Sequence, residues 1–251
     1  GDHRDLHSFP TRRSSDLLRE ICFKAKKHNI PIRVGVNSGS SNDLNEIPVQ
    51  NLIENTKDFI YKLESLDFKN IVISIKGSNV LETIEANRII SDIFPKYPLH
   101  LGLTEAGFKD ISLIRSTACL SPLLLDGIGN TIRISISGNP KDEIIAAKRL
   151  LHDIGWYPNY PTIISCPTCG RTQVDVISLS KKIMDYLEAI NKPVKVAVMG
   201  CFVNGIGEAN NADIGVAGGN NEFFIFKNKK IIKKVDESNI FVSLKEEIDK
   251  L

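Results

Sequence analysis

The chain has 251 residues, of which 42% are hydrophobic and 25% are charged, so it has the composition of a globular protein with one large domain or two smaller ones. A disordered or fibrous protein is excluded on the same ground. The net charge of +2 is too small to predict a nucleic-acid partner, and no apolar run approaches the roughly 20 residues of a membrane helix.

Residues 1–17 show neither helical nor alternating apolar periodicity, and an amphipathic helix is predicted to begin directly after them, at Leu18. The pair Arg12 and Arg13 lacks the apolar segment of an export signal, so export is not predicted. A basic, serine-rich tail is a second interpretation. Residues 7–17 resemble, codon by codon, the translation of a short-read sequencing adapter, and we therefore interpret 1–17 as a non-native assembly scar.

Helical and extended patterns alternate from residue 18 to residue 137. Helices are predicted at 18–29, 49–66, 80–94 and 111–125, and strands follow them at 30–37, 70–76, 99–104 and 131–137. Four such units in series predict a parallel sheet with helical crossovers. The glycines after the fourth helix, Gly127 and Gly129, are interpreted as a helix cap and turn rather than a nucleotide-binding loop, because no helix follows them directly.

Polar and apolar residues alternate within the predicted strands, and the apolar ones are expected to meet the helices. The other face carries Arg33, Asn37, Lys76, Arg133, Ser135 and Ser137. Cations near the C-terminal ends of parallel strands, on the face away from the helices, are typical of the mouth of a TIM barrel. We expect the three cations to converge on a phosphate or diphosphate, with the amide and hydroxyls as neutral donors. Ordinary solvated surface charge is the alternative.

Glu105 lies one position beyond the third strand, on a loop at the same predicted mouth. A carboxylate among cations either balances charge or moves protons during a dehydration.

A second domain is predicted after the helix at 141–152. A strand at 162–165, a helix at 177–190, a strand at 194–199 and a hairpin at 222–234, turned at Asn228, form a small α/β layer. The expected organisation is a leader at 1–17, a barrel domain at 18–152 and a metal-binding domain at 153–251.

Three of the five cysteines have metal-type spacing. Cys166 and Cys169 form a C-x-x-C pair, and Cys201 ends a later strand. Three thiolates leave a fourth position open, and the nearest donor in the Cys201 motif is Glu208, whose hard carboxylate would be exchangeable. A redox pair or half of a structural zinc site are the alternatives.

The two remaining cysteines, Cys22 and Cys119, fall in helical apolar patterns and are predicted to be buried, inert thiols. This cysteine usage favours a reducing compartment, and we expect a cytoplasmic protein.

Three motifs carry a family resemblance: S-C-P-T-C-G-R at 165–171, M-G-C-F-V-N-G-I-G-E-A at 199–209 and A-D-I-G-V-A-G-G at 212–219. They closely resemble the C-terminal domain of the hydroxymethylbutenyl diphosphate synthase family of isoprenoid biosynthesis. The resemblance implies a [4Fe-4S] cluster held by Cys166, Cys169, Cys201 and Glu208. Ile206 stands where the family usually has proline, so the loop that presents Glu208 is expected to be less rigid.

Four further motifs look like successive barrel motifs of the same family: I-R-V-G-V-N-S-G-S at 32–40, S-I-K-G-S at 74–78, L-H-L-G-L-T-E-A-G at 99–107 and D-G-I-G-N-T-I-R-I-S at 126–135. By position, the resemblance implies that Glu105 and Glu208 act in catalysis. The implied substrate-diphosphate contacts are Arg33, Asn37, Lys76, Arg133 and Ser135. No room exists between Arg133 and Cys166 for the extra domain of the plant-like form, so the two-domain bacterial form is expected.

The activity that the resemblance implies is the reductive opening and dehydroxylation of methylerythritol cyclodiphosphate. Electrons would come from flavodoxin or ferredoxin, since the sequence shows no nucleotide-cofactor fingerprint, and the full-length enzyme is expected to be a homodimer. Two alternatives stay open from the residues alone: an electron-transfer or anion-binding module without turnover, and a zinc-stabilised barrel of unrelated chemistry. Radical SAM enzymes are disfavoured because their C-x-x-x-C-x-x-C run is absent.

The expected fold class is α/β, with the C-terminal half of a TIM barrel followed by a small iron-sulfur domain. A TIM barrel closes with eight βα units, and only four strands are predicted before the cysteines. We therefore expect the biological chain to extend upstream of Leu18, and this fragment to be poorly soluble or inactive alone.

Overall fold

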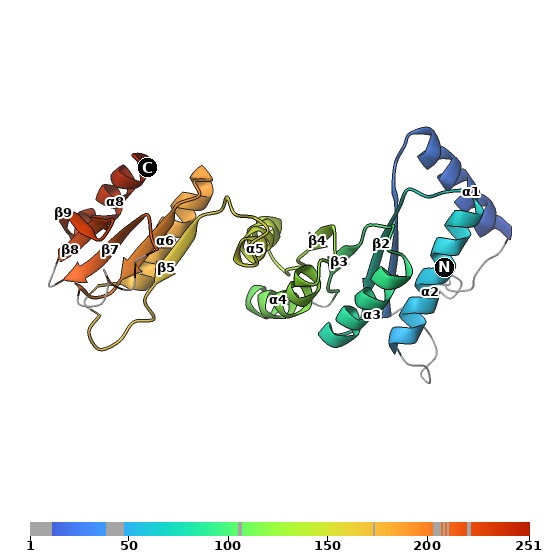
Figure 1. The fold of residues 1–251 in the computed structure, drawn as a ribbon, viewed down its shortest axis with the longest axis horizontal. Helices are drawn as coiled ribbons and strands as arrows, with labels where there is room; N and C mark the ends of the chain where they lie inside the picture. The colour runs from blue at the N-terminus through green and yellow to red at the C-terminus, as the bar shows by residue number, and fades with distance from the viewer. Residues whose placement is uncertain are drawn as a thin grey trace. The chain divides into compact units, whose positions relative to one another are not determined.

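The structure, a computed structural model, describes residues 12–38, 48–104, 107–172, 174–202, 207, 209, 211–219 and 222–251. The chain divides into two compact units, Gly1–Ile154 and Gly155–Leu251, and each is described by itself (Figure 1). The boundary lies two residues beyond the expected one. None of the helices in the described ranges is long and apolar enough to cross a membrane.

The first unit alternates helices and parallel strands. In chain order its elements are α1 (Arg12–Lys27), β1 (Ile32–Asn37), α2 (Pro48–Ser65), β2 (Ile71–Lys76), α3 (Val80–Ile93), β3 (His100–Gly102), α4 (Lys109–Leu125), β4 (Thr131–Arg133) and α5 (Pro140–Asp153). β1 pairs with β2 and β3 with β4, all parallel, and a parallel bridge between Ile73 and Leu99 joins the two pairs. The predicted succession of helices and strands and the α/β class are confirmed.

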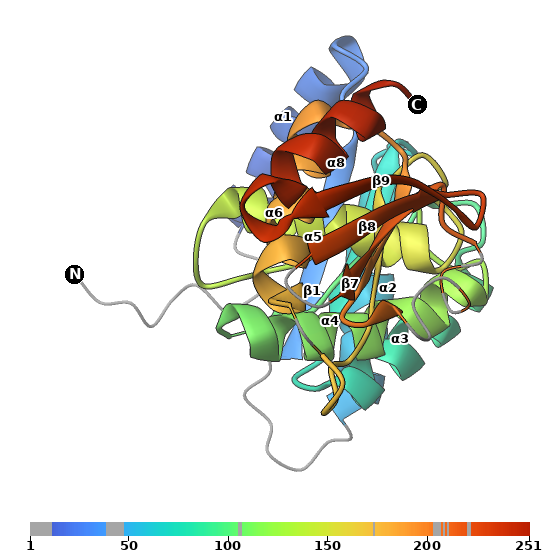
Figure 2. The same ribbon diagram turned by 90° about the vertical axis from the view of Figure 1, so that its left-hand side faces the viewer.

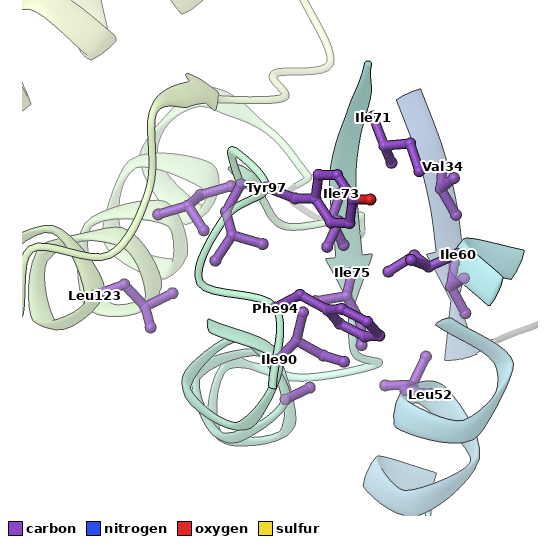
Figure 3. Packing of buried hydrophobic residues seen from close by; sticks show 14 of the residues in the cluster. Val34, Leu52, Ile60, Ile71, Ile73, Ile75, Ile90, Phe94, Tyr97 and Leu123 are labelled. Carbon is purple, nitrogen blue, oxygen red and sulfur yellow. The ribbon is translucent and has the colours of Figure 1, made fainter. Parts of the chain in front are cut away.

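One face of these strands is covered by helices. The helices from α2 to α5 pack side by side in chain order, and each of them contacts a strand. Alternate strand residues such as Val34, Val36 and Ile75 are buried on that face, and Figure 3 shows Ile60, Ile90 and Phe94 of the helical layer gathered around the β1–β2 pair. Burying this apolar set supplies the main driving force for the layer. On β1 the opposite face exposes Arg33 and Asn37.

Two boundaries differ from expectation by four residues or more. α1 begins at Arg12, six residues before Leu18; the non-native origin of 1–17 stays a prediction. β4 ends at Arg133 rather than at residue 137. The backbone groups beyond it bond elsewhere: Ser112 Oγ donates to the Ser135 carbonyl at 2.7 Å, and the Ile136 N–H donates to Glu143 Oε1 at 2.9 Å.

The second unit is a mixed five-stranded sheet with the order β5-β6-β7-β8-β9. Its elements are β5 (Thr162–Ser165), α6 (Val176–Ile190), β6 (Lys195–Met199), β7 (Ile214–Gly219), β8 (Glu222–Lys227), β9 (Lys230–Asp236), the 3-10 turn η3 (Glu237–Asn239) and α8 (Ile240–Asp249). β5, β6 and β7 are parallel, whereas β8 and β9 are antiparallel neighbours, and Figure 2 shows β7, β8 and β9 side by side. The hairpin expected at Asn228 is confirmed: Asn228 and Lys229 both have positive φ, as a two-residue hairpin turn requires.

The sequence analysis missed β7 and α8. β7 reads I-G-V-A-G-G, which lacks alternation and is poor in strand-forming residues. It forms a strand because it is buried along its whole length and because its glycines admit neighbouring rings: a Cβ on Gly215 would lie 2.2 Å from Phe226. α8 did carry a signal, since its buried Ile240, Leu244 and Ile248 have helical spacing.

Gly77 directly follows the last residue of β2 and packs against the start of α3. The Gly77 N–H donates to Thr83 Oγ1 at 3.0 Å, and a Cβ at Gly77 would lie 2.7 Å from Glu82 Cβ and 2.9 Å from the Thr83 nitrogen. Only the absence of a side chain lets the chain turn here directly into α3, immediately after Lys76.

Gly77→Ala is therefore expected to destabilise the protein by about 1–3 kcal/mol, the usual range for overpacking. Gly35→Ala is the matched control, because nothing lies within 4 Å of a Cβ built on Gly35, and its effect should stay within about 0.5 kcal/mol. Urea unfolding of both variants measures the difference. Equal stability of the two would show that the contact at Gly77 relaxes without cost.

Candidate functional sites

The strand register places a row of polar residues across the open face of the first unit. Asn37 pairs with Lys76, and Gly102 pairs with Arg133. Continuing the register from the Ile73–Leu99 bridge sets Lys76 beside Gly102. Parallel strands in register point paired residues to the same side, so Asn37, Lys76 and Arg133 share one row in which Gly102 carries no side chain.

Lys76 uses the space above Gly102. Its Nζ lies 3.5 Å, and its Cε 3.3 Å, from the position that a Gly102 Cβ would take. Burial, and then the charges of Arg133 and Arg33, lower the pKa of the Lys76 ammonium. The three cations that the sequence analysis selected therefore act on one another electrostatically, and Arg33, which pairs with Val72, lies four residues before Asn37 on the same face of β1. Like charges on one face favour a bound anion.

The sequence analysis also expected Ser135 and Glu105 at this site. Ser135 lies two residues beyond β4, and its carbonyl accepts the hydrogen bond from Ser112. Glu105 lies outside the described residues.

One polar residue of this face was missed by the sequence analysis. His100 on β3 pairs with Thr131, and its Nδ1 lies 2.8 Å from Thr131 Oγ1. Its Nε2 is buried and has no hydrogen-bond partner among the residues that the structure describes. Burial, and then the charges of Arg33, Lys76 and Arg133, lower the pKa of the imidazole. The sequence did contain a signal for this residue. His100 lies between Leu99 and Leu101, and this alternation predicts that it faces away from the helices.

The second unit gathers the three selected cysteines around one pocket. Cys166 follows β5 and Cys201 follows the end of β6, which is the parallel neighbour of β5. The pocket has a volume of about 190 Å³, and Cys169 lies on the same wall. It is lined by Cys166, Pro167, Thr168, Cys169, Arg171, Thr172 and Cys201.

Hydrogen-bond donors contact two of the sulfurs that line the pocket. The Gly200 N–H donates to Cys166 Sγ at 3.1 Å. Hydrogen bonds from the backbone and the guanidinium of Arg171 lower the pKa of Cys169. Thiolates are the form in which cysteine binds metal. In the described ranges no three His, Cys, Asp or Glu side chains lie close enough to hold a single ion, and Glu208 lies outside those ranges.

The other two cysteines are buried, as predicted. Burial raises the pKa of Cys22 and raises the pKa of Cys119 to about 11, so both thiols stay protonated and unreactive at neutral pH.

An aromatic pair holds the segment that carries Cys201. The rings of Phe202 and Phe224 have centroids 4.9 Å apart at an interplanar angle of 57°. Phe224 belongs to β8, two strands away from β6, and its ring lies over Gly219, where a Cβ would approach to 2.8 Å. Lys234 Nζ lies 5.8 Å from the centre of the same ring. The pair therefore ties the residue directly after Cys201 to β8.

Comparison with known proteins covers both units. Residues 11–148 match the family model described as GcpE TIM-barrel domain, and residues 162–250 match the GcpE protein C-terminal domain. The first match begins inside the segment that was expected to be non-native.

Individual relatives agree with the family match. A 4-hydroxy-3-methylbut-2-en-1-yl diphosphate synthase (flavodoxin) of Clostridium acetobutylicum is 45% identical over 243 residues, which are 95% of this chain and 69% of the relative. Proteins of the same name from Mycoplasmoides gallisepticum and Ruminiclostridium cellulolyticum are 45% and 43% identical over 94% of this chain, and the matches cover 67% and 68% of their lengths. The chain spans about two thirds of the length of these relatives.

Phe202→Ala is expected to loosen the Cys201 segment. An aromatic pair is worth about 0.5–1.5 kcal/mol, so alkylation of Cys201 by iodoacetamide in metal-free protein should accelerate by about two- to tenfold. Phe224→Ala should have the same effect, and the double variant should add little to either.

Phe108→Ala is the matched control, because this phenylalanine is 75% exposed in the first unit. Peptide mass spectrometry reports the rate at each cysteine. An unchanged Cys201 rate in both single variants would contradict the role of the pair.

Proposed function

This chain belongs to the GcpE family, and we propose on that basis that it catalyses the reaction for which its relatives are named. The reaction is the reductive opening and dehydroxylation of 2-C-methyl-D-erythritol 2,4-cyclodiphosphate to (E)-4-hydroxy-3-methylbut-2-enyl diphosphate. The protein would be an oxidoreductase of isoprenoid biosynthesis. On this proposal β1 to β4, with α2 to α5, are four consecutive βα units of the family's barrel, and the second unit is its iron-sulfur domain.

The observation that carries the proposal is the convergence of Arg33, Lys76 and Arg133 on the face away from the helices. A diphosphate carries the negative charge and the acceptor oxygens that such a group of cations binds. Guanidinium groups bind phosphate through bidentate hydrogen bonds. The ends of parallel barrel strands are where substrates bind. Asn37 shares a row with Lys76 and would donate from its amide. Ser135 would contribute its hydroxyl from just beyond β4.

The pocket of the second unit would hold a [4Fe-4S] cluster. Three thiols line one cavity of about 190 Å³, the Gly200 N–H donates to Cys166 Sγ, and hydrogen bonds from Arg171 lower the pKa of Cys169. When bound, the cluster would supply the two electrons of the reaction, one at a time. Glu208 is proposed as its fourth, exchangeable ligand.

The proposal also assigns a proton donor and an electron donor. Glu105 is proposed to donate the proton that the departing hydroxyl requires, because it follows the third strand at the cation-bearing edge. Electrons are proposed to come from a flavodoxin, after which the relatives are named, or from a ferredoxin. A homodimer and a cytoplasmic location remain predictions.

Metal and sulfide analysis of anaerobically purified protein tests the cluster. Iron and acid-labile sulfide are expected, and zinc alone would contradict the proposal. Addition of cyclodiphosphate should then change the electron paramagnetic resonance spectrum of the reduced cluster. A cluster that is insensitive to substrate would indicate an electron-transfer module instead.

Replacing Arg33, Lys76 or Arg133 by Met should weaken substrate binding by about 1.5–3 kcal/mol each, the value of a charged hydrogen bond. Arg88→Met is the control, because this exposed arginine pairs with Asp126 on the surface. Calorimetry with cyclodiphosphate gives the affinities. If all three variants bind like the unmodified protein, these cations are ordinary surface charge.

Cys201→Ala should prevent stable cluster assembly, because only two thiolates would remain. Glu208→Ala should retain iron and sulfide while turnover falls severely, and Cys22→Ala should keep both. Iron content and activity with reduced flavodoxin separate these outcomes. Full activity of Glu208→Ala would remove this carboxylate from the ligand set.

A further inference from the structure

His100 lies in the middle of the cation-bearing face, one row deeper than Lys76 and Arg133. It precedes Gly102 by two residues on β3, so both point to the same side. The register places Ser74 of β2 on one side of it and Thr131 of β4 on the other. The residue is only 9% exposed, which is unusual for a histidine on the face away from an apolar core.

Only one of the two ring nitrogens has a partner. Nδ1 lies 2.8 Å from Thr131 Oγ1, which fixes the plane of the ring. Nε2 is buried and has no partner among the described residues. A buried polar atom without a hydrogen bond costs free energy, so this nitrogen requires an explanation.

The charges around the ring decide which form of the imidazole is favoured. Three cations act on it from three strands: Arg33 on β1, Lys76 on β2 and Arg133 on β4. An N–H aimed at cations is repelled, whereas a lone pair is attracted. The favoured tautomer therefore carries its hydrogen on Nδ1, donates it to Thr131 Oγ1 and leaves a lone pair on Nε2. The same charges, together with burial, lower the pKa of the ring and keep it neutral.

A neutral acceptor suits a site that must bind an anion. Three like charges repel one another, and the flexible Lys76 side chain, which lies over Gly102, becomes better ordered when a neighbouring group accepts its hydrogen bonds. A carboxylate in this position would hold the cations but would also cancel the charge that attracts a diphosphate. An imidazole lone pair holds a cation and leaves the net charge of the site unchanged.

We infer that His100 is a positioning residue of the anion site: a neutral imidazole, tied to Thr131 through Nδ1, whose Nε2 lone pair has no partner among the described residues and accepts a hydrogen bond from one of the surrounding cations when a diphosphate binds. The inference rests on the proposed function only as far as the anion site, and it does not involve the cluster.

Two isosteric variants separate this role from a merely structural one. His100→Asn keeps a polar group near the position of Nδ1 and loses Nε2, whereas His100→Gln places its amide oxygen near the position of Nε2. The probe is inorganic pyrophosphate, and calorimetry on the 251-residue chain without cluster gives the affinity, so no turnover is needed. His100→Asn should lose about tenfold in affinity, and His100→Gln should stay within about threefold of the unmodified protein.

A structural role, in which only the Thr131 contact matters, predicts the reverse order of the two variants and would overturn the inference. Thr131→Val supplies a further comparison, because it removes the tie at Nδ1 and should also reduce affinity for pyrophosphate. Thermal unfolding of each variant shows whether the variant is still folded.

Nitrogen NMR of the imidazole in the unmodified protein requires no variant. It should show a protonated Nδ1 and an unprotonated Nε2 at neutral pH, and the opposite tautomer or a charged ring would overturn the inference.

The controls distinguish this inference from the proposed function. If Lys76→Met weakens pyrophosphate binding and His100→Asn does not, only the role of His100 is wrong. If the unmodified protein does not bind pyrophosphate, both the proposed anion site and the inference about His100 are wrong. Neither outcome bears on the metal content of the second unit.

Discussion

In-register parallel pairing of neighbouring strands is the constraint on which both candidate sites depend. Parallel strands point paired residues to one side and end at the same edge. In the first unit this aligns Asn37 with Lys76 and Gly102 with Arg133. In the second it brings Cys166, after β5, next to the segment that ends in Cys201, after β6. A register shift of one residue would turn the cations towards the helices.

Glycines provide the space that these arrangements require. Gly102 leaves room for the Lys76 side chain to cross β3, and Gly200 fits against Thr172 at a point where a Cβ would approach to 2.9 Å. Gly219 accepts the ring of Phe224, which in turn contacts Phe202. In each case a missing side chain on one strand lets a functional or supporting residue of another reach across it.

The two sites stabilise charge in opposite ways. In the first unit, cations lie together despite burial and mutual repulsion, and their charges act on the neutral ring of His100. In the second, an N–H donates to one cysteine sulfur and Arg171 lowers the pKa of another. One site therefore attracts an anionic ligand, and the other prepares anionic ligands for a metal.

Sequence alone determined the order of helices and strands, the three cations and the three cysteines, because alternation in strands and C-x-x-C spacing are local patterns. It did not reveal β7, whose glycine-rich run becomes a strand only between β6 and β8. It also did not reveal His100, which looks like one polar residue among leucines. Its bond to Thr131 and the charges around it come from residues 24 to 67 positions away in the chain. Only the tertiary structure decided these features, since contacts between distant strands depend on a register that no single strand encodes.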